Sequence, residues 1–598
     1  MHLRRVRIQN YRNLEDVDFE LSPGLNVLVG KNNVGKSNVF TAIRHALGPA
    51  ASRGDWLPHL RREDFRHDEV GMTSPTISVS LEFEGLSSAE RAQFFEILDF
   101  DVETPDRSLA VVNFRAEWDE QRGRVGTYKR WGGGDAQGPD VPTAILRALP
   151  ITFLTALRDA ESALSPGRGS RLAELVQELA RGEDRVAHHE RIVEIFAEAN
   201  AGLESDELIT DAQRRLEDGL QDMAGIDYSA AKIRASDQKF SRILESLQVL
   251  VEGNPVPSLG SSGLGYNNLL YMATVLAHLR NAPDDEQPLL LIEEPEAHLH
   301  PQLVQHLARA LAADSDGPPD AAPQTLLATH SPVLASKVPP TRVVVIFAEP
   351  GSEKVTVRNL SGAGLNEQEE RQLSRMMDIT RAAVYFASGV ILVEGVSEEL
   401  LLPRIADLLG TDLAKRQVSV VPLCGVAFSA FAKVFGPKGL GVPVSIVSDA
   451  DPKVTGRDDW RTATPEMDTD GLPKLSGRAS RLVEEYDGHD SIKVFTSKIT
   501  LEYDLAAAAP GNVSLMTTVW RDGYPRTQTV TEEVVEESTD PALGFWRGVC
   551  LAQHGWGKAE FAHLLADRLS QLESEGEFAV PPYLRNAVMY ACNAEGEG

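Results

Sequence analysis

The sequence predicts an α/β protein made of several domains. Apolar runs at residues 3–8 and 25–29 are typical of strands, and a glycine-rich turn and a helical pattern over 38–47 follow them. In the last third of the chain, strand-like runs alternate with helical stretches, which indicates βαβ units and a mainly parallel sheet. A length of 598 residues leaves room for three or four domains.

The composition is that of a globular protein. Hydrophobic residues make up 42% and charged residues 25%, which excludes a disordered or fibrous chain. No apolar run approaches the roughly 20 residues of a membrane span, and the basic start lacks the apolar segment of a signal peptide. We therefore expect a cytoplasmic protein without a membrane partner.

Cysteine content and charge limit the kinds of site. The three cysteines form no C-x-x-C pair, which argues against a disulfide framework or a zinc site and leaves oxygen ligands for any metal. The net charge of −29 repels nucleic acid on average, so binding of DNA would depend on local basic patches. Part of the acidic excess fits carboxylates gathered for magnesium.

The N-terminal α/β domain is interrupted. Alternating residues at 77–83 and 110–118 predict half-buried antiparallel strands. Apolar residues then fall at helical spacing among Glu and Arg, which predicts a helical insertion. Strand-like runs resume at 289–292, 325–328 and 343–347.

The second α/β unit has strand candidates at 390–393, 418–421, 442–447 and 492–495, and a long tail follows them. We expect the linker between the two units near 361–370. The predicted segments are the N-terminal part of the first domain at 1–160, the insertion at 161–250, the C-terminal part of the first domain at 251–375, and the last domain at 376–598.

Residues 30–37, GKNNVGKS, fit the phosphate-loop pattern G-x-x-x-x-G-K-[ST] directly between a strand and a helix. Backbone N–H groups at the glycines close around phosphate, Lys36 reaches the β and γ oxygens, and the hydroxyl of Ser37 binds magnesium. We therefore expect ATP with Mg²⁺ at a site formed by Gly30, Asn33, Gly35, Lys36 and Ser37.

The segment LLLIEEPEAHLHP begins at residue 289, about 250 residues after the loop. Its four apolar residues predict a buried strand that ends at two carboxylates. Glu293 is expected to bind magnesium, usually through water, and Glu294 to orient or deprotonate the attacking water. By itself such a run also fits a core strand with an acidic end, and the phosphate loop favours the catalytic interpretation.

These segments resemble the ABC-type ATPases of the SMC and DNA-repair group. The segment YRNL at 11–14 is similar to an early motif of that group, and GSSGLGYNN at 260–268, with Ser262 and Gly263, is similar to its signature loop. His330 in Thr329-His330-Ser331 resembles the switch histidine. The resemblance implies a dimer bridged by nucleotide. Glu293 stands where many members of the group carry Asp, and no Q-loop glutamine is apparent.

A second set of carboxylates lies in the last domain. An apolar strand ends at Glu394, and Glu398 follows in the first turn of the next helix. Another strand ends at Asp449 and Asp451, and their alternation points both acids to one region if the extended geometry persists. Because like charges raise each other's pKa, divalent cations would relieve the cost of grouping these acids at the edge where α/β sheets bind ligands.

This arrangement resembles the Toprim fold of topoisomerases, primases and the overcoming-lysogenization-defect (OLD) nucleases. An ABC-type ATPase followed by a Toprim domain and a C-terminal helical extension is the OLD layout, and the resemblance covers nearly the whole chain. It implies a further metal ligand at Glu502 and a lysine that stabilises the transition state, for which Lys558 is the candidate and Lys498 its rival. The D-x-D form and the long tail favour class 2, which includes the nuclease subunit of the Gabija antiphage system and is often paired with a UvrD-like helicase.

The predicted function is metal-dependent endonucleolytic cleavage of DNA, by two Mg²⁺ or Mn²⁺ ions, in a homodimer or higher homo-oligomer regulated by ATP, in phage defence or DNA processing. The catalytic residues are expected to be Glu394, Glu398, Asp449, Asp451, Lys558 and Glu294. One alternative is a non-cleaving ABC-type ATPase that binds DNA or senses a signal. A topoisomerase would need a nucleophilic tyrosine, for which Tyr503 and Tyr524 are present, and a primase fits the N-terminal ATPase least.

Overall fold

The structure is a computed structural model of the whole chain. It describes residues 1–593 apart from 52–58, 69–70, 73, 101–107, 135–137, 156–162, 168–169, 180–184, 225–238, 248–262, 281–287, 314–322, 349–353, 424–427, 457–460, 525–534, 536–537, 552–556, 573 and 575.

The chain folds into two compact units that are interleaved along the sequence. The first consists of Met1–Arg12, Ser22–Leu25 and Ser37–Ala328, and the second of Asn13–Leu21, Asn26–Lys36 and Thr329–Gly598. In the described part of the chain, no helix combines the length and the apolar character needed to cross a membrane.

The first unit contains an antiparallel sheet. Its strands follow the order β1 (His2–Tyr11), β6 (Thr76–Glu84), β8 (Leu109–Asp119) and β7 (Leu98–Asp99), and β9 (Arg124–Gly132) also pairs with β8. Buried and half-buried residues alternate along β6, so the strands predicted over 77–83 and 110–118 are confirmed. Strand β9 was not predicted, because its sequence RVGTYKRWG lacks apolar alternation and most of it is exposed.

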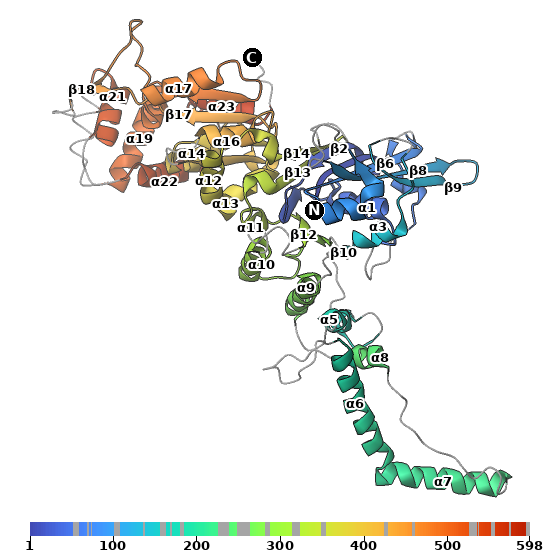
Figure 1. Ribbon diagram of the computed structural model, residues 1–598. Coiled ribbons are helices and arrows are strands. Elements are labelled where there is room, and N and C mark those ends of the chain that lie inside the picture. Colours follow the sequence, from blue (N-terminus) through green and yellow to red (C-terminus); the bar gives the residue numbers. More distant parts are fainter. Residues whose placement is uncertain are drawn as a thin grey trace. The chain divides into compact units, whose positions relative to one another are not determined.

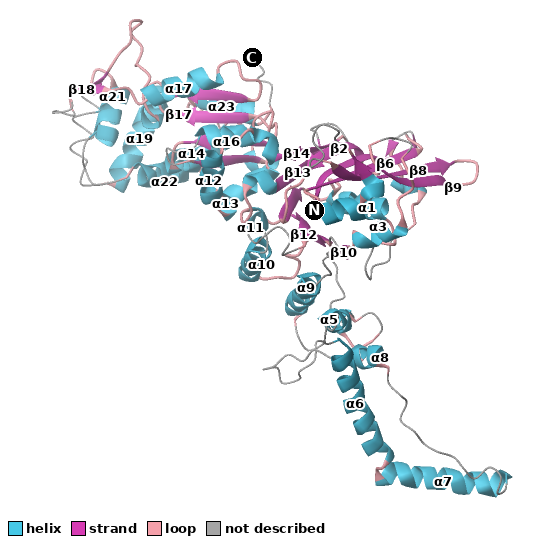
Figure 2. Ribbon diagram, viewed as in Figure 1, coloured by secondary structure: helices cyan, strands magenta, loops and turns pink. Residues whose placement is uncertain are grey.

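The same unit contains three parallel strands and a group of helices. Strands β10 (Ile151–Leu154), β11 (Leu289–Glu293) and β12 (Gln324–Thr329) pair in register. Figure 2 shows helices and loops, and no strand, in the described parts of the chain between β10 and β11. These helices are α5 (Arg171–Leu179), α6 (Arg185–Glu204), α7 (Glu207–Ala224), α8 (Phe240–Glu245) and α9 (Leu264–Arg280).

The second unit contains most of the strand that carries the phosphate loop. Strand β3 (Leu25–Gly30) pairs parallel with β13 (Val343–Ala348), which pairs antiparallel with β14 (Val355–Asn359). Strand β2 (Leu14–Glu20), which was not predicted, lies beside β14.

The segment expected to be a linker is instead structured. It forms η7 (Leu360–Ala363) and the start of α12 (Glu367–Met376). Asn366 and Glu369 form a reciprocal capping box at the start of α12. Glu369 also pairs with Lys433 of α16 (Phe428–Phe435) at 2.6 Å, so this segment is packed against the last domain.

The last domain is built on a four-stranded parallel sheet in the order β16 (Val418–Pro422), β15 (Gly389–Val393), β17 (Val444–Ser448) and β20 (Ile492–Thr496). The central strands β15 and β17 are buried along their whole length. Helices α14 (Val396–Leu408), α17 (Gly477–Tyr486) and α23 (Pro582–Ala591) accompany the sheet (Figure 1). The mainly parallel sheet predicted for this region is therefore confirmed.

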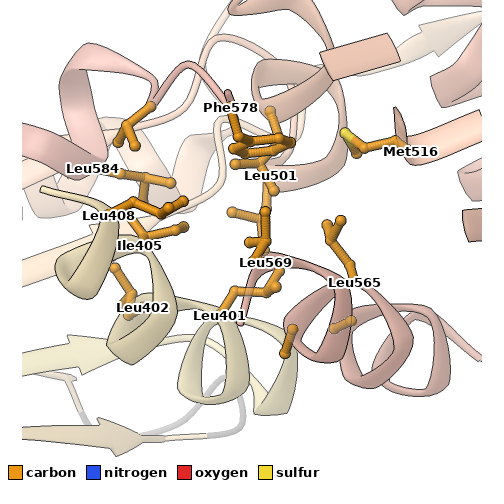
Figure 3. Packing of buried hydrophobic residues seen from close by; sticks show 14 of the residues in the cluster. Leu401, Leu402, Ile405, Leu408, Leu501, Met516, Leu565, Leu569, Phe578 and Leu584 are labelled. Atoms are coloured by element: carbon orange, nitrogen blue, oxygen red, sulfur yellow. The ribbon is translucent and has the colours of Figure 1, made fainter. Parts of the chain in front are cut away.

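A large hydrophobic cluster joins α14 to the C-terminal helices (Figure 3). Leu401 and Ile405 of α14 contribute to it, as do Leu565 and Phe578 from the end of the chain. The C-terminal helical extension is thus part of the Toprim-like core. Its helices are α18 (Leu501–Ala507), α19 (Pro510–Gly523), α21 (Pro541–Trp546) and α22 (Lys558–Leu569).

Shorter elements complete the described fold. They are α2 (Ser88–Gln93), α3 (Thr143–Ala148), α10 (Pro301–Ala313), α11 (Pro332–Ala335), α13 (Ile379–Ala382) and α15 (Leu413–Arg416), with α1 (Lys36–Leu47) after the phosphate loop and the two-residue strands β4 (His67–Asp68), β5 (Gly71–Met72), β18 (Val454–Thr455) and β19 (Thr464–Pro465).

Truncation of Leu565 tests the role of the hydrophobic cluster between α14 and the C-terminal helices. Because Leu565 is fully buried, Leu565→Ala is expected to destabilise the last domain by about 2–5 kcal/mol. Urea denaturation followed by circular dichroism measures the loss. Leu472→Ala removes an exposed side chain and is the matched control, expected to stay within about 0.5 kcal/mol of the parent. Equal midpoints for both variants would contradict the packing described.

Candidate active site

Acidic residues collect at the carboxyl edge of the parallel sheet. Glu394 directly follows β15, Asp449 directly follows β17, and Glu398 lies in the first turn of α14. Strands β15 and β17 are parallel neighbours, so both end at the same edge. This edge is where open α/β sheets bind ligands.

The Glu394 carboxylate is fixed at both oxygens. Its Oε1 accepts hydrogen bonds from the Ser448 hydroxyl at 2.5 Å and from the Asp449 backbone N–H at 3.1 Å. Its Oε2 lies 3.2 Å from Nη1 of Arg478. These contacts join the ends of β15 and β17 to the start of α17.

Glu398 is a buried acid. Its Oε2 accepts a hydrogen bond from the Gly395 N–H at 3.1 Å, which closes the turn between β15 and α14. Burial raises its pKa, and the negative charges of Glu502 and Glu394 raise it further.

Asp449 lies at the centre of the group. Its Oδ1 accepts a hydrogen bond from the Ser497 hydroxyl at 3.1 Å, and Ser497 in turn accepts one from the Ala450 N–H at 3.0 Å. Burial raises the pKa of Asp449 well above its usual range, and the charges of Glu502 and Glu398 add to the effect. The negative charges of these acids therefore lie close together at a site with little access to solvent.

Glu502 joins the same group from the first turn of α18, where it is buried. Lys558 Nζ lies 3.4 Å from each of its carboxylate oxygens, and the Cys550 thiol donates to Oε2 at 3.5 Å. Burial alone would lower the pKa of Lys558, but the charges of Glu502, Cys550 and Asp449 outweigh it and raise that pKa. The lysine therefore stays charged beside the acids.

The two candidate lysines differ in position. Lys558 forms the ion pair with Glu502, whereas the Lys498 side chain is exposed and its backbone N–H donates to Asp504. The geometry favours Lys558, and its catalytic role stays a prediction.

The geometry expected for Asp451 is wrong. Strand β17 ends at Ser448, and Asp451 has a φ of 44°, so the extended alternation does not reach it. Its N–H donates to the Ile499 carbonyl at 3.0 Å and its side chain is exposed. The buried acids of the group are joined instead by Glu502.

In the part of the chain that the structure describes, no three Asp, Glu, His or Cys side chains already converge as the ligands of one metal ion. The acids share an edge of the sheet without forming a finished coordination shell. Their chemistry still fits hard divalent cations, because all are oxygen donors and two of them have raised pKa values that a cation would lower.

Sequence reasoning missed four side chains that touch these acids, namely Ser448, Arg478, Ser497 and Cys550. Ser448 is the last residue of β17 and Ser497 directly follows β20, so the position at a strand end is the signal that could have identified them. Arg478 and Cys550 come from distant helical segments, and no pattern in the sequence relates them to Glu394 or Glu502.

The phosphate loop has the expected conformation. Gly30 ends β3, where a Cβ would come within 2.3 Å of the Ile346 carbonyl oxygen, so only glycine fits. Asn33 and Gly35 have positive φ values of 63° and 106°. Lys36 is buried, and its Nζ donates to the carbonyl oxygens of Gly30 and Lys31 at 2.9 Å.

His330 lies beside this loop, with its Nδ1 at 3.3 Å from Lys36 Nζ. The structure therefore brings together two residues that are 294 positions apart and that were both assigned to nucleotide binding.

A second lysine of the loop makes a different contact. Lys31 Nζ donates to the Ser388 hydroxyl at 3.0 Å and to Oε1 of Gln417. Ser388 directly precedes β15 and Gln417 directly precedes β16. The loop is thus bonded to the start of the strand whose other end carries Glu394.

The remaining nucleotide-site candidates belong to the first unit. Glu293 is the last residue of β11, and Glu294 follows with a φ of 40° and a hydrogen bond from its N–H to the Ala328 carbonyl. Ser37 is exposed in the first turn of α1, and Gly263 directly precedes α9. Ser262 lies outside the described residues. The joint action of these residues in one ATP site stays a prediction.

Two known domain families match the chain. Residues 385–451 match the family described as Overcoming lysogenization defect protein-like, TOPRIM domain. Residues 1–106 and 151–335 match the AAA ATPase domain. The first match contains Glu394, Glu398 and Asp449, and the second contains the phosphate loop and Glu293.

Curated relatives cover most of the chain. An OLD nuclease from Thermus scotoductus is 24% identical over 75% of this chain and 82% of its own length. Endonuclease GajA from Bacillus cereus is 22% identical over 68% of each chain. Among solved structures, the C-terminal region of the Burkholderia pseudomallei OLD protein is 28% identical with a TM-score of 0.27, and the match covers 35% of this chain and 98% of that one.

The raised pKa of Asp449 predicts that this acid destabilises the protein when it ionises. A carboxyl whose pKa is raised by folding favours the folded state while protonated, and this contribution is lost as pH rises through its folded pKa. Asp449→Asn should therefore have a higher Tm than the parent at pH 8 in chelator, by a few degrees, and the difference should shrink toward pH 4. Differential scanning fluorimetry at both pH values measures it.

Asp451→Asn is the matched control, since the same change at an exposed position should leave the Tm unchanged at either pH. A lower Tm for Asp449→Asn than for the parent at pH 8 would contradict this prediction, because it would show that the ionised Asp449 side chain stabilises the folded protein.

Proposed function

We propose that this protein is a metal-dependent DNA endonuclease regulated by ATP. The chain joins a match to the AAA ATPase domain with a match to the OLD-like Toprim domain. The observation that carries the proposal is the group of four acids at the carboxyl edge of the Toprim sheet with Lys558 beside them. Its relatives in Thermus scotoductus and Bacillus cereus are named as a nuclease and an endonuclease. The proposal includes the class 2 branch of the OLD family and a role in phage defence or DNA processing, which rest on the resemblance of the D-x-D form and of the long tail.

The chain's own residues divide the work of phosphodiester hydrolysis. Glu394, Glu398, Asp449 and Glu502 are the proposed holders of Mg²⁺ or Mn²⁺, with the exposed Asp451 at the rim as a further ligand. When bound there, a pair of such cations would supply the positive charge that stabilises the entering and the leaving oxygen of an in-line displacement. Lys558 places a compact positive charge next to Glu502, where it would face the developing charge on the phosphate.

In the ATPase domain, the proposed roles follow the motifs. Lys36 binds the phosphates of ATP and Ser37 and Glu293 hold its Mg²⁺, while Glu294 and His330 act on the terminal phosphate. The resemblance to ABC-type ATPases supports a homodimer or higher homo-oligomer bridged by nucleotide. A UvrD-like helicase is the proposed additional partner.

A topoisomerase mechanism receives no support from the candidate tyrosines. Tyr503 and Tyr524 are partly buried and pack against the hydrophobic cluster of the last domain. Neither is presented as a free nucleophile toward a DNA strand.

Cleavage of supercoiled plasmid tests the nuclease proposal. With Mg²⁺ or Mn²⁺ the protein should give nicked or linear DNA, and Glu394→Ala and Asp449→Ala should lower the rate at least about 100-fold, because each removes a proposed metal ligand. Glu399→Ala alters the next acid on the same helix and should cut like the parent. Cleavage that persists unchanged in both acid variants would come from a contaminant and would leave the non-cleaving ATPase as the function.

The proposed regulation by ATP is supported by the contact of Lys31 with Ser388 and Gln417. A change in the phosphate loop on nucleotide binding would alter the anchoring of β15, the strand that ends at Glu394. Lys31→Met should therefore bring the ratio of cleavage rates with and without ATP close to one, while ATP binding measured by calorimetry persists.

Two variants complete that experiment. Gln417→Ala removes the partner on the Toprim side and should have the same effect as Lys31→Met, whereas Lys36→Ala should abolish ATP binding itself. If Lys31→Met and Gln417→Ala respond to ATP as the parent does, this contact does not transmit the signal.

A further inference from the structure

Arg478 belongs to none of the motifs in the sequence, yet it contacts Glu394, one of the four acids of the group. It lies in the first turn of α17, about 30 residues after Asp449. Its Nη1 is 3.2 Å from Oε2 of Glu394, and its guanidinium carbon lies 5.3 Å from the centre of the Phe428 ring. Its side chain is 38% exposed and that of Glu394 is 17% exposed, so the pair is partly shielded from water.

The helix that carries Arg478 is anchored to the Asp449 loop. The Ser476 N–H donates to the Ala450 carbonyl at 2.8 Å, and the Ser476 hydroxyl accepts a hydrogen bond from the Ala479 N–H as the N-cap. Any shift of the loop therefore moves the start of α17 with it. The backbone position from which Arg478 reaches Glu394 is therefore tied to the Asp449 loop.

Glu394 is consequently held in one orientation. Ser448 and the Asp449 N–H occupy Oε1, and Arg478 occupies Oε2, which fixes the plane of the carboxylate. We infer that Arg478 is a positioning residue for Glu394, required for the orientation of this carboxylate in the cleavage reaction. The inference rests on the proposed nuclease function.

Stability does not explain the presence of this arginine. Its Nη2 is buried and has no hydrogen-bond partner among the described residues, which is unfavourable for a charged donor. Its one ion pair in the described part of the chain, with Glu394, relieves some of the repulsion among the acids and so offsets this cost. Replacement by an apolar side chain of similar length should therefore leave the folding stability nearly unchanged.

Metal affinity does not explain it either. A fixed positive charge next to a metal ligand repels a divalent cation, so removal of Arg478 should not weaken metal binding. What the arginine adds is geometry, because a guanidinium group held over the Phe428 ring contacts Oε2 of Glu394 from one direction, which a flexible lysine cannot reproduce. A positioning role thus predicts that replacement of Arg478 lowers the cleavage rate and leaves the metal affinity equal or tighter.

The test compares Arg478→Met, Arg478→Lys and the control Arg481→Met in the full-length protein. Arg481 lies three residues further along α17, is exposed, and bonds only to the Gly477 carbonyl in the contacts described. Single-turnover plasmid cleavage is measured across a Mn²⁺ titration, Mn²⁺ binding by calorimetry without DNA, and Tm by scanning fluorimetry.

Arg478→Met should lower the rate at saturating Mn²⁺ by about 10–100-fold, the usual effect of removing a partner that orients a metal ligand. Its Kd for Mn²⁺ should be equal to or tighter than that of the parent, and its Tm should lie within about 2 °C. Arg478→Lys should recover part of the rate, and Arg481→Met should match the parent in all three measurements.

Several results would overturn the inference. They are an unchanged rate in Arg478→Met, a rate loss that additional Mn²⁺ fully restores, or complete rescue by lysine, which would indicate a role for charge alone. If Asp449→Ala abolishes cleavage while Arg478→Met cuts normally, only this inference fails. If Asp449→Ala cuts like the parent, the proposed function fails and the inference with it.

Discussion

The repulsion among four carboxylates at one edge of a buried sheet is the constraint on which the last domain depends. Glu394, Glu398 and Asp449 come from the ends of two adjacent parallel strands and from the helix that follows, and Glu502 comes from α18. Two of these acids have pKa values raised first by burial and then by their neighbours. Such a group is unfavourable in the protein alone, and natural sites of this kind are maintained because the same charges are needed by a ligand.

The surrounding structure provides the rigidity that this arrangement requires. The hydrophobic cluster fixes α14 against α22 and the C-terminal helices, so Glu398 and Lys558 are held by one core (Figure 3). Serine hydroxyls at the ends of β17 and β20 then fix the individual carboxylates. Packing therefore determines where the backbone places the acids, and short hydrogen bonds determine how the carboxylates are turned.

The sequence predicted the elements whose signals are local. The strands that directly precede Glu394 and Asp449 are rich in apolar residues, and the phosphate loop has a fixed spacing of glycines and lysine, so both were identified from neighbouring residues. Strand β9 was missed because it is a polar edge strand. The segment at 361–370 was taken for a linker because its ion pair with Lys433 depends on tertiary contact, although the capping box of Asn366 and Glu369 is a local signal of a helix start. Asp451 was misplaced since nothing in the letters marks the residue at which the extended geometry ends. Arg478 was not predicted because its partner Glu394 lies 84 positions earlier in the chain.

The comparison between Lys558 and Arg478 shows how a site can use two cations differently. Lys558 Nζ lies 3.4 Å from both oxygens of Glu502, and its half-exposed side chain carries the ammonium group on a flexible stem that can reach toward a phosphate. Arg478 is stacked over Phe428 and carried by a helix whose N-cap is bonded to the Asp449 loop, so it has little freedom to follow a substrate. The mobile cation suits a charge that develops during the reaction, and the fixed cation suits a carboxylate that must not turn. The side-chain chemistry of Lys558 thus agrees with stabilisation of the transition state, and that of Arg478 agrees with orientation of Glu394.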